Sequence, residues 1–258
     1  IKFKYMFFVI LIIKKFRFEK FEFMKKILLI FFLAIFFNCE RKSENKEWIY
    51  LFSDKYSSYW KAYNGDTLPK KWKITNNILT FDTDFKLENE YIKGSDIIFS
   101  KEEFGNFELY LEWKLPKGGN SGIFYHLKEG FEETSEVAPE YQLLDDDGWE
   151  ELNKAKLSPW QKAGADYAMY SPDIEVKKLY PSGEWNSSKI IFTEKKVEYW
   201  LNEQKVLSFI PWSQDWYERK KNGKWKDSKF YGRFKEGYIG LQDHNSSISF
   251  RNMKIRKL

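Results

Sequence analysis

A glutamate and a histidine stand in settings that could support acid–base chemistry. Glu140 and Gln142 are two residues apart, so in a strand they would share one face while Tyr141 and Leu143 share the other. His244, one of two histidines, follows another alternating run, and the pKa range of histidine suits proton transfer near neutral pH. Glu140 and His244 are therefore the candidate catalytic residues. A surface glutamate and a structural histidine are the alternatives.

Further polar residues with the same spacing extend this candidate site, and amide and imidazole groups on a sheet face suit a sugar ligand. The candidate substrate-binding residues are Glu112, Asn120, His126, Gln142, Asp145, Glu184, Asn186 and Gln242. All of these except His126 and Asp145 are expected to line one cleft with Glu140 and His244. Around Trp185 we favour Glu184 and Asn186 in the cleft and the tryptophan in the core. The reverse would make Trp185 a stacking platform for a sugar.

The elements that must position these residues read as short antiparallel strands. The run from 107 to 115 alternates cleanly between apolar and charged residues, and Asn76-Asn77 and Asn202-Glu203 each predict a tight hairpin turn. No long segment has a helical period, so only short helices are expected. The pattern predicts an all-β fold, an antiparallel two-sheet jelly-roll sandwich over residues 48–258. Its expected core includes Leu109, Leu111, Trp113, Ile239, Leu241 and Phe250.

Composition and charge agree with this fold and exclude one class of partner. Aromatic residues make up 20% of the chain, with 11 Trp and 16 Tyr, and such residues suit pleated, half-buried surfaces. The formal net charge is +5, but the basic excess lies in residues 1–38 and the rest of the chain is nearly neutral. A nearly neutral body has no electrostatic footprint for nucleic acid. The sequence does not specify an oligomeric state.

The N-terminal segment has the layout of an export signal. Basic residues after Met24 precede an unbroken apolar run, Ile27 to Phe37, and Cys39 follows. We expect residues 1–38 to comprise upstream residues and a signal peptide, with translation starting at Met24. Cys39 is then a lipidated first residue and 39–47 a charged linker. This predicts an exported lipoprotein of a bacterial cell envelope, on the periplasmic or outer-membrane face and bound to the membrane by its lipid. A plain signal peptide or uncleaved anchor is the alternative.

Six ordered motifs carry a resemblance to a known family. They are Asn120-Ser121-Gly122-Ile123-Phe124, Glu140-Tyr141-Gln142-Leu143-Leu144-Asp145, Gly183-Glu184-Trp185-Asn186, Tyr199-Trp200-Leu201-Asn202, Gly240-Leu241-Gln242-Asp243-His244 and Phe250-Arg251-Asn252. Over residues 48–258 the chain resembles the 3-keto-disaccharide hydrolase family, which has a concanavalin-like, LamG-like jelly roll. The resemblance implies cleavage of glycosides oxidised at sugar C3, by C2 proton abstraction, elimination and hydration, without a nicotinamide cofactor. His126 departs from the arginine that the resemblance implies there.

Other functions and a metal site remain as alternatives. A non-catalytic carbohydrate-binding protein would need an aromatic platform but no acid–base pair. A retaining glycosidase of the same fold ranks third, because the strand with alternating Glu, Asp and Glu that such enzymes usually show is absent from the sequence. The acidic cluster at Asp145-Asp146-Asp147 could bind Ca²⁺, but it lacks spaced ligands, so a solvated loop is favoured. A zinc site is not expected with two histidines and one cysteine.

Overall fold

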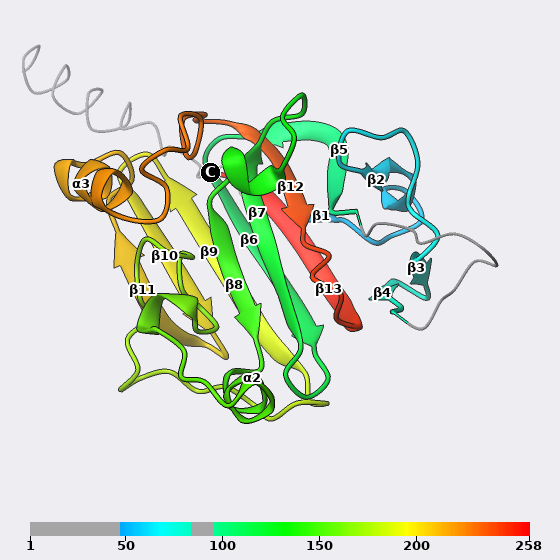
Figure 1. Ribbon diagram of the computed structural model, residues 1–258. Helices are drawn as coiled ribbons and strands as arrows, with labels where there is room; N and C mark the ends of the chain where they lie inside the picture. Colours follow the sequence, from blue (N-terminus) through cyan, green and yellow to red (C-terminus); the bar gives the residue numbers. More distant parts are fainter. Residues whose placement is uncertain (1–46, 84–94) are drawn as a thin grey trace, which may run out of the picture. The chain divides into compact units, whose positions relative to one another are not determined.

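The computed structural model of the protein describes residues 47–83 and 95–258, in which all the paired strands are antiparallel and form two sheets (Figure 1). The larger sheet has the order β11 (Gln204–Phe209), β10 (Lys196–Leu201), β9 (Asn186–Thr193), β6 (Phe107–Lys114), β13 (Ile248–Lys257), β4 (Ile78–Phe81) and β3 (Trp72–Thr75), and β1 (Ile49–Tyr50) also pairs with β13. The smaller sheet has the order β2 (Trp60–Ala62), β5 (Ile97–Phe104), β12 (Gly237–Leu241), β7 (Asn120–Leu127) and β8 (Glu140–Leu144). In Figure 1, β8, β7 and β12 lie in front of β9, β6 and β13.

The core lies between the two sheets and is built by strand alternation. In β6 the residues at odd positions from 107 to 113 are buried, and those at even positions are partly exposed. All six core residues predicted from the sequence are at most 1% exposed. The predicted all-β, two-sheet antiparallel jelly-roll sandwich is therefore confirmed.

Both predicted hairpin turns are present, and their backbone explains the asparagines. Asn76 and Asn77 connect β3 to β4 with φ of 52° and 60°, and Asn202 and Glu203 connect β10 to β11 with φ of 46° and 66°. A two-residue hairpin turn with positive φ at both positions matches the twist of the flanking strands, and asparagine tolerates this conformation better than most residues.

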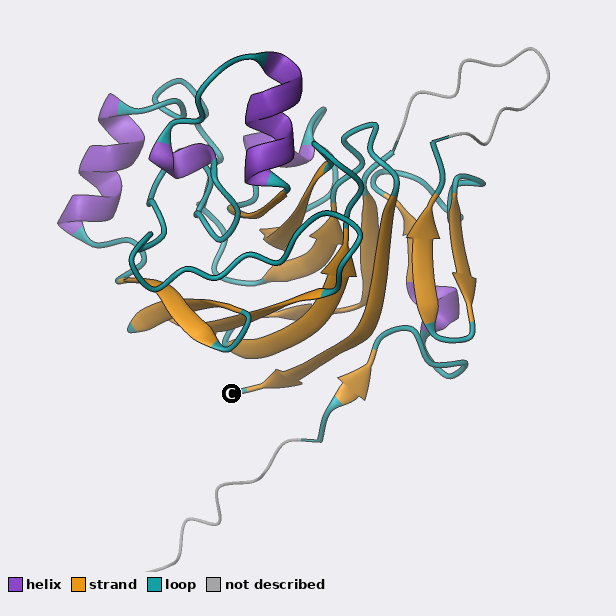
Figure 2. Ribbon diagram, turned by 90° about the horizontal axis from the view of Figure 1, so that it is seen from below, coloured by secondary structure: helices purple, strands orange, loops and turns teal. Residues whose placement is uncertain are grey.

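Two short α-helices and three 3₁₀ turns, η1 (Ser57–Tyr59), η2 (Thr134–Glu136) and η3 (Pro159–Gln161), complete the described elements. Helix α3 (Gln214–Asn222) begins after Ser213, whose hydroxyl accepts a hydrogen bond from the Trp216 amide. Helix α2 (Asp146–Asn153) corrects the solvated loop expected for the acidic cluster. Acidic residues in a first turn stabilise the partial positive charge of a helix N-terminus, so Asp146 and Asp147 favour this helix. Figure 2 shows α2 and α3 with their loops on one side of the strands.

Strand β8 is buried on both faces, and one of these faces forms part of the pocket described below. All five of its residues are buried. Tyr141 and Leu143 pack in the core between the sheets, whereas Leu144 packs with Leu157 and Ala163 on the other side. Loops therefore cover the face of the smaller sheet that points away from the larger one.

The described residues include no helix that is both long and apolar enough to cross a bilayer. The predicted signal segment and Cys39 lie outside the described residues. The lipid anchor and the proposed domain boundaries therefore stay predictions.

Candidate active site

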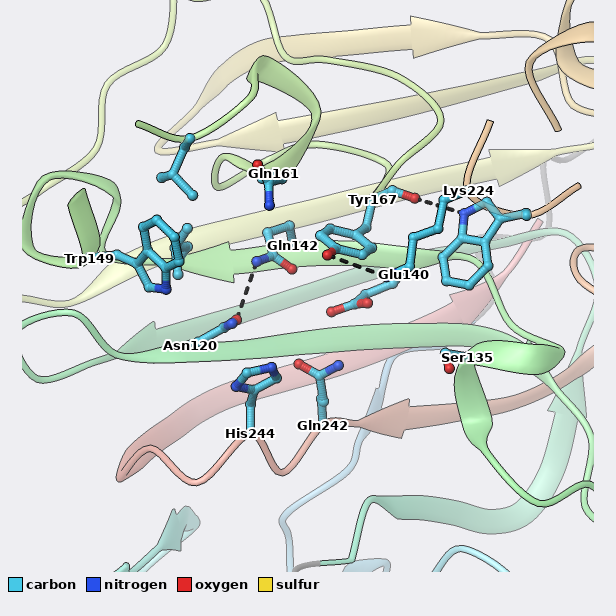
Figure 3. Close-up of a pocket in the computed structure, with 13 residues that line it drawn as sticks. Asn120, Ser135, Glu140, Gln142, Trp149, Gln161, Tyr167, Lys224, Gln242 and His244 are labelled. Carbon is cyan, nitrogen blue, oxygen red and sulfur yellow. Dashed lines mark hydrogen bonds between the residues drawn. The ribbon is translucent and has the colours of Figure 1, made fainter. Parts of the chain in front are cut away.

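A pocket of about 270 Å³ opens on the loop-covered face of the smaller sheet (Figure 3). Strands β7 and β8 and the segment after β12 supply its floor, while α2, the loop after it and the segment after α3 supply its walls. The lining residues are Asn120, Ser135, Glu140, Gln142, Leu144, Trp149, Leu157, Gln161, Tyr167, Lys224, Trp225, Gln242 and His244. Polar groups and aromatic rings thus surround one small hollow, as a sugar site requires.

Glu140 is the most perturbed group in this pocket. Its side chain is 5% exposed, and Oε1 has no hydrogen-bond partner among the described residues. The pKa of Glu140 is raised to about 8, mainly by burial and to a lesser degree by the nearby charges of Asp96 and Asp166, while Lys224 opposes the shift. A buried carboxyl group that is poised near neutral pH and lies in a pocket is a candidate acid or base.

Gly122 makes the position of this carboxyl group possible. Strands β7 and β8 place Gly122 opposite Gln142, two pairs away from Glu140. A Cβ atom at Gly122 would lie 2.1 Å from Glu140 Oε1. The carboxyl group therefore occupies the volume that a side chain at position 122 would fill, and this explains the glycine in the first family-like motif.

Amide groups lie beside the carboxyl group on the same floor. Gln142 donates a hydrogen bond from Nε2 to Asn120 Oδ1 at 3.2 Å. The backbone of Gln242 is held to β7, because its amide donates to the Gly122 carbonyl at 2.9 Å and its carbonyl accepts from Ser121 Oγ at 2.8 Å. The side-chain oxygen of Gln242 is buried without a partner among the described residues. These amides can exchange hydrogen bonds with sugar hydroxyls.

His244 lies at the rim of the pocket on the segment that follows β12. Figure 3 shows its ring across the pocket floor from Gln142 and beside Gln242. The residue is exposed, whereas Glu140 is buried. A water-accessible imidazole and a desolvated carboxyl group therefore line one pocket.

The structure adds a cation, Lys224, and the ring of Tyr167, which the sequence did not indicate, and it places both beside Trp225. Lys224 Nζ lies 4.4 Å from the centre of the Tyr167 ring and 4.8 Å from that of Trp225. Tyr167 belongs to a segment that continues the sheet beyond β8, since its amide donates to the Glu140 carbonyl at 2.9 Å. Trp149 and Gln161 complete the wall. These residues come from helix α2, from turn η3 and from two later segments, so no local spacing connects them in the sequence.

Five of the predicted site residues line this pocket and five lie elsewhere, which corrects the expectation of one cleft for Glu112, Glu184 and Asn186. Glu112 lies on the outer face of the larger sheet, where its Oε2 is 2.6 Å from Arg251 Nε. Glu184 is exposed and outside the pocket. Asn186 points inward and binds backbone groups of Tyr180, so the assumed orientation of this strand was reversed. Trp185 instead lies outside, under the Arg251 guanidinium.

The remaining two candidates, His126 and Asp145, also lie outside the pocket. His126 is buried with Nε2 2.9 Å from the Gly105 carbonyl, and burial lowers its pKa to about 4. Asp145 accepts a hydrogen bond from the Gly118 amide at 2.8 Å and lines a different cavity beside α2. Asp146 forms a buried ion pair with Lys177. Within residues 47–83 and 95–258, no cluster of three or more His, Cys, Asp or Glu has the geometry to hold a metal ion.

Comparison with known proteins places this fold and pocket among carbohydrate-cleaving enzymes of the glycosidase class. The sequence model of the family described as 3-keto-alpha-glucoside-1,2-lyase-like domain matches residues 47–256. The chain therefore belongs to this family. A 3-keto-disaccharide hydrolase of Bacteroides thetaiotaomicron is 32% identical over 231 residues, which cover 82% of this chain and 78% of the relative.

Two solved structures from Parabacteroides distasonis ATCC 8503, both described as candidate glycosyl hydrolases, are also similar. The first is 38% identical with a TM-score of 0.72 and covers 82% of this chain and 94% of its own. The second is 26% identical with a TM-score of 0.55 and covers 77% of this chain and 99% of its own.

Proposed function

We propose that this chain cleaves 3-keto-glycosides, with Glu140 as the base that removes the C2 proton. The observation that carries the proposal is the buried carboxyl group of Glu140, which lines the pocket and whose Oε1 has no hydrogen-bond partner among the described residues. Family membership and the name of the Bacteroides relative support the choice of a ketone-bearing sugar.

The reaction makes physical demands that this pocket can meet. A ketone at C3 acidifies the proton on C2, so a carboxylate can take that proton while the electron pair moves onto the ketone oxygen. The negative charge that develops there needs a cation or hydrogen-bond donors. Lys224 is the cation whose field already reaches Glu140, because it opposes the rise in the pKa of that group.

The second half of the reaction breaks the glycosidic bond. The enolate reforms the ketone, the C1–O bond breaks, and a double bond forms between C1 and C2. His244 supplies the proton that the departing oxygen needs. Water then adds its hydroxyl to C1 and a proton to C2, so the sum is a hydrolysis that consumes no oxidant and requires no nicotinamide.

A panel of substrates tests this proposal. The purified protein is incubated with 3-keto-glucosides and their unoxidised parents, and the products are followed by mass spectrometry in deuterium oxide. We expect cleavage of the ketones alone, with deuterium at C2, and Glu140→Gln should lower the rate about 10²–10⁴-fold, the usual contribution of a general base. Equal cleavage of the unoxidised parents would refute elimination. Binding of oligosaccharides without any cleavage would favour a carbohydrate-binding protein instead.

A further inference from the structure

A second cavity, of about 560 Å³, lies directly beside the candidate active site. Ser135, Gln242 and His244 line both hollows, so these three residues mark the boundary between them. The proposed reaction occupies the smaller pocket and leaves the second cavity without a role. Its own lining is strongly acidic and polar and includes Asn64, Asp96, Glu132, Glu133, Asp243 and Asn245.

The boundary between the two hollows is fixed by one partly buried carboxylate. Asp96, at the start of β5, accepts a hydrogen bond from Thr134 Oγ1 at 2.5 Å and another from the Asp243 amide at 2.8 Å. Ser135 follows Thr134 directly, and Gln242 and His244 flank Asp243. A single side chain therefore holds the two segments that supply all three shared residues.

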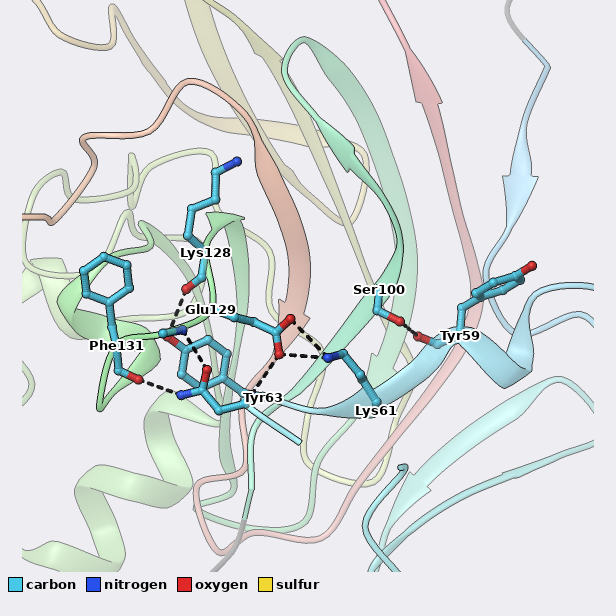
Figure 4. A network of polar contacts seen from close by, with 9 residues as sticks. Tyr59, Lys61, Tyr63, Ser100, Lys128, Glu129 and Phe131 are labelled. Atoms are coloured by element: carbon cyan, nitrogen blue, oxygen red, sulfur yellow. Dashed lines mark hydrogen bonds and ion pairs between the residues drawn. The ribbon is translucent and has the colours of Figure 1, made fainter. Parts of the chain in front are cut away.

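Hydrogen bonds within the protein also hold the part of the cavity wall that Tyr63 and Asn64 form (Figure 4). Asn64 donates from Nδ2 to the Phe131 carbonyl at 2.7 Å and accepts from the Gly130 amide at 2.8 Å. The Tyr63 hydroxyl donates to the Lys128 carbonyl at 2.9 Å. These bonds fasten the turn after β2 to the loop after β7, so the cavity does not need a ligand to form it.

The chemistry of this lining points to a neutral molecule with many hydroxyl groups. Carboxylates accept hydrogen bonds from hydroxyls strongly, because one partner carries a full charge. Several carboxylates in one hollow also repel phosphates and acidic sugars. The unpartnered oxygen of Gln242 at the boundary can accept one further bond.

We propose that this cavity is the subsite for the leaving sugar of the substrate, so that a neutral disaccharide spans the boundary at Gln242 and His244. This inference rests on the proposed function, which places the keto sugar over Glu140. The glycosidic oxygen then lies at the boundary, beside His244. The substrate class is accordingly a 3-keto-disaccharide whose second sugar carries no charge.

Three ketone substrates and one variant test the subsite. The substrates are methyl 3-keto-glucoside, a 3-keto-disaccharide with a neutral leaving sugar, and the same disaccharide with a uronic acid as its leaving sugar. We expect kcat/KM for the neutral disaccharide to exceed that of both others by about tenfold or more, the value of one hydrogen bond to a charged group. Glu132→Gln/Glu133→Gln should lower kcat/KM for the neutral disaccharide several-fold and raise it for the acidic one.

A matched control removes two carboxylates from elsewhere on the surface. Glu175→Gln/Glu218→Gln changes two exposed residues that line neither hollow, and it should leave the order of the three substrates unchanged. Cleavage of methyl 3-keto-glucoside at the same rate as both disaccharides would overturn the subsite and leave the proposed function standing. Cleavage of none of the three would overturn both. Activity that disappears with a chelator and returns with Ca²⁺ would assign the carboxylates to a cation instead.

Discussion

The protonation state of Glu140 depends more on its surroundings than on the ordinary acidity of a carboxyl group. Burial is the main cause of its pKa of about 8, and the charge of Asp96 is the next. At pH 7 most of the molecules without substrate therefore carry a protonated Glu140. A base with this pKa is stronger than an ordinary carboxylate, but fewer molecules hold it in the active form at neutral pH.

The pH dependence of kcat/KM should show the titration of Glu140 directly. If Glu140 is the base, kcat/KM on a 3-keto-glycoside should rise with pH and level off above about 8, because kcat/KM follows the titration of the free enzyme. Asp96→Asn removes a nearby negative charge, so the rise in kcat/KM should occur at lower pH in this variant. A profile without a rise below pH 8, or with a rise that Asp96→Asn does not move, would argue against Glu140 as the base.

Gly122→Ala tests the position of the carboxyl group without removing it. The added Cβ would lie 2.1 Å from Glu140 Oε1, so the carboxyl group must move, and we expect kcat to fall by about 10²-fold. Gly105→Ala is the matched control, since its nearest new contact is 3.5 Å and it lies outside the pocket. Equal activity of the two variants would show that the position of the carboxyl group does not limit the rate.

At the scale of elements, strands were predictable and the segments between them were not. Alternation in 107–115 identified β6, and Asn202-Glu203 identified the turn between β10 and β11, because both signals are local. The floor residues Glu140 and Gln142 followed from the same rule. Lys224 and Tyr167 did not, because only the packing of distant loops brings them to β8. Asn186 was misplaced because spacing gives the two faces of a strand but not which face points inward.

The segment beside β8 makes a separate prediction about stability. Asp166 is fully buried and has no hydrogen-bond partner for either oxygen among the described residues. Burial raises its pKa well above the usual value, and Tyr199 opposes this only in part. The folded protein therefore keeps a proton that the unfolded chain loses above pH 4, so stability falls as the pH rises.

Asp166→Asn should remove much of this dependence. Each pH unit costs about 1.4 kcal/mol while Asp166 keeps its proton only in the folded state, which corresponds to about 3 °C in Tm. We expect the Tm of the natural protein to drop between pH 5 and pH 8, and that of the variant to drop less. Glu140 contributes with the same sign, so a residual slope should persist. Parallel curves for the two proteins would contradict the assignment.

At the scale of the whole molecule, we propose that Cys39 attaches the enzyme to a membrane by a lipid. The basic and apolar segment before it motivates the proposal. Cys39→Ala should move the protein from the membrane fraction to the soluble fraction while the rate on 3-keto-glycosides is unchanged. Detection is by immunoblotting of fractionated cells. Retention of the variant in the membrane would indicate an uncleaved hydrophobic segment.

The contact between Gly122 and Glu140 also restricts how this sequence can drift over evolution. Two positions on neighbouring strands share one volume, so a larger residue at 122 is tolerable only with a shorter acid at 140. Any lineage that acquires alanine at 122 should therefore carry aspartate at 140 or lose the activity. Selection here acts on the sum of two side-chain volumes, in addition to the carboxyl group that position 140 must supply.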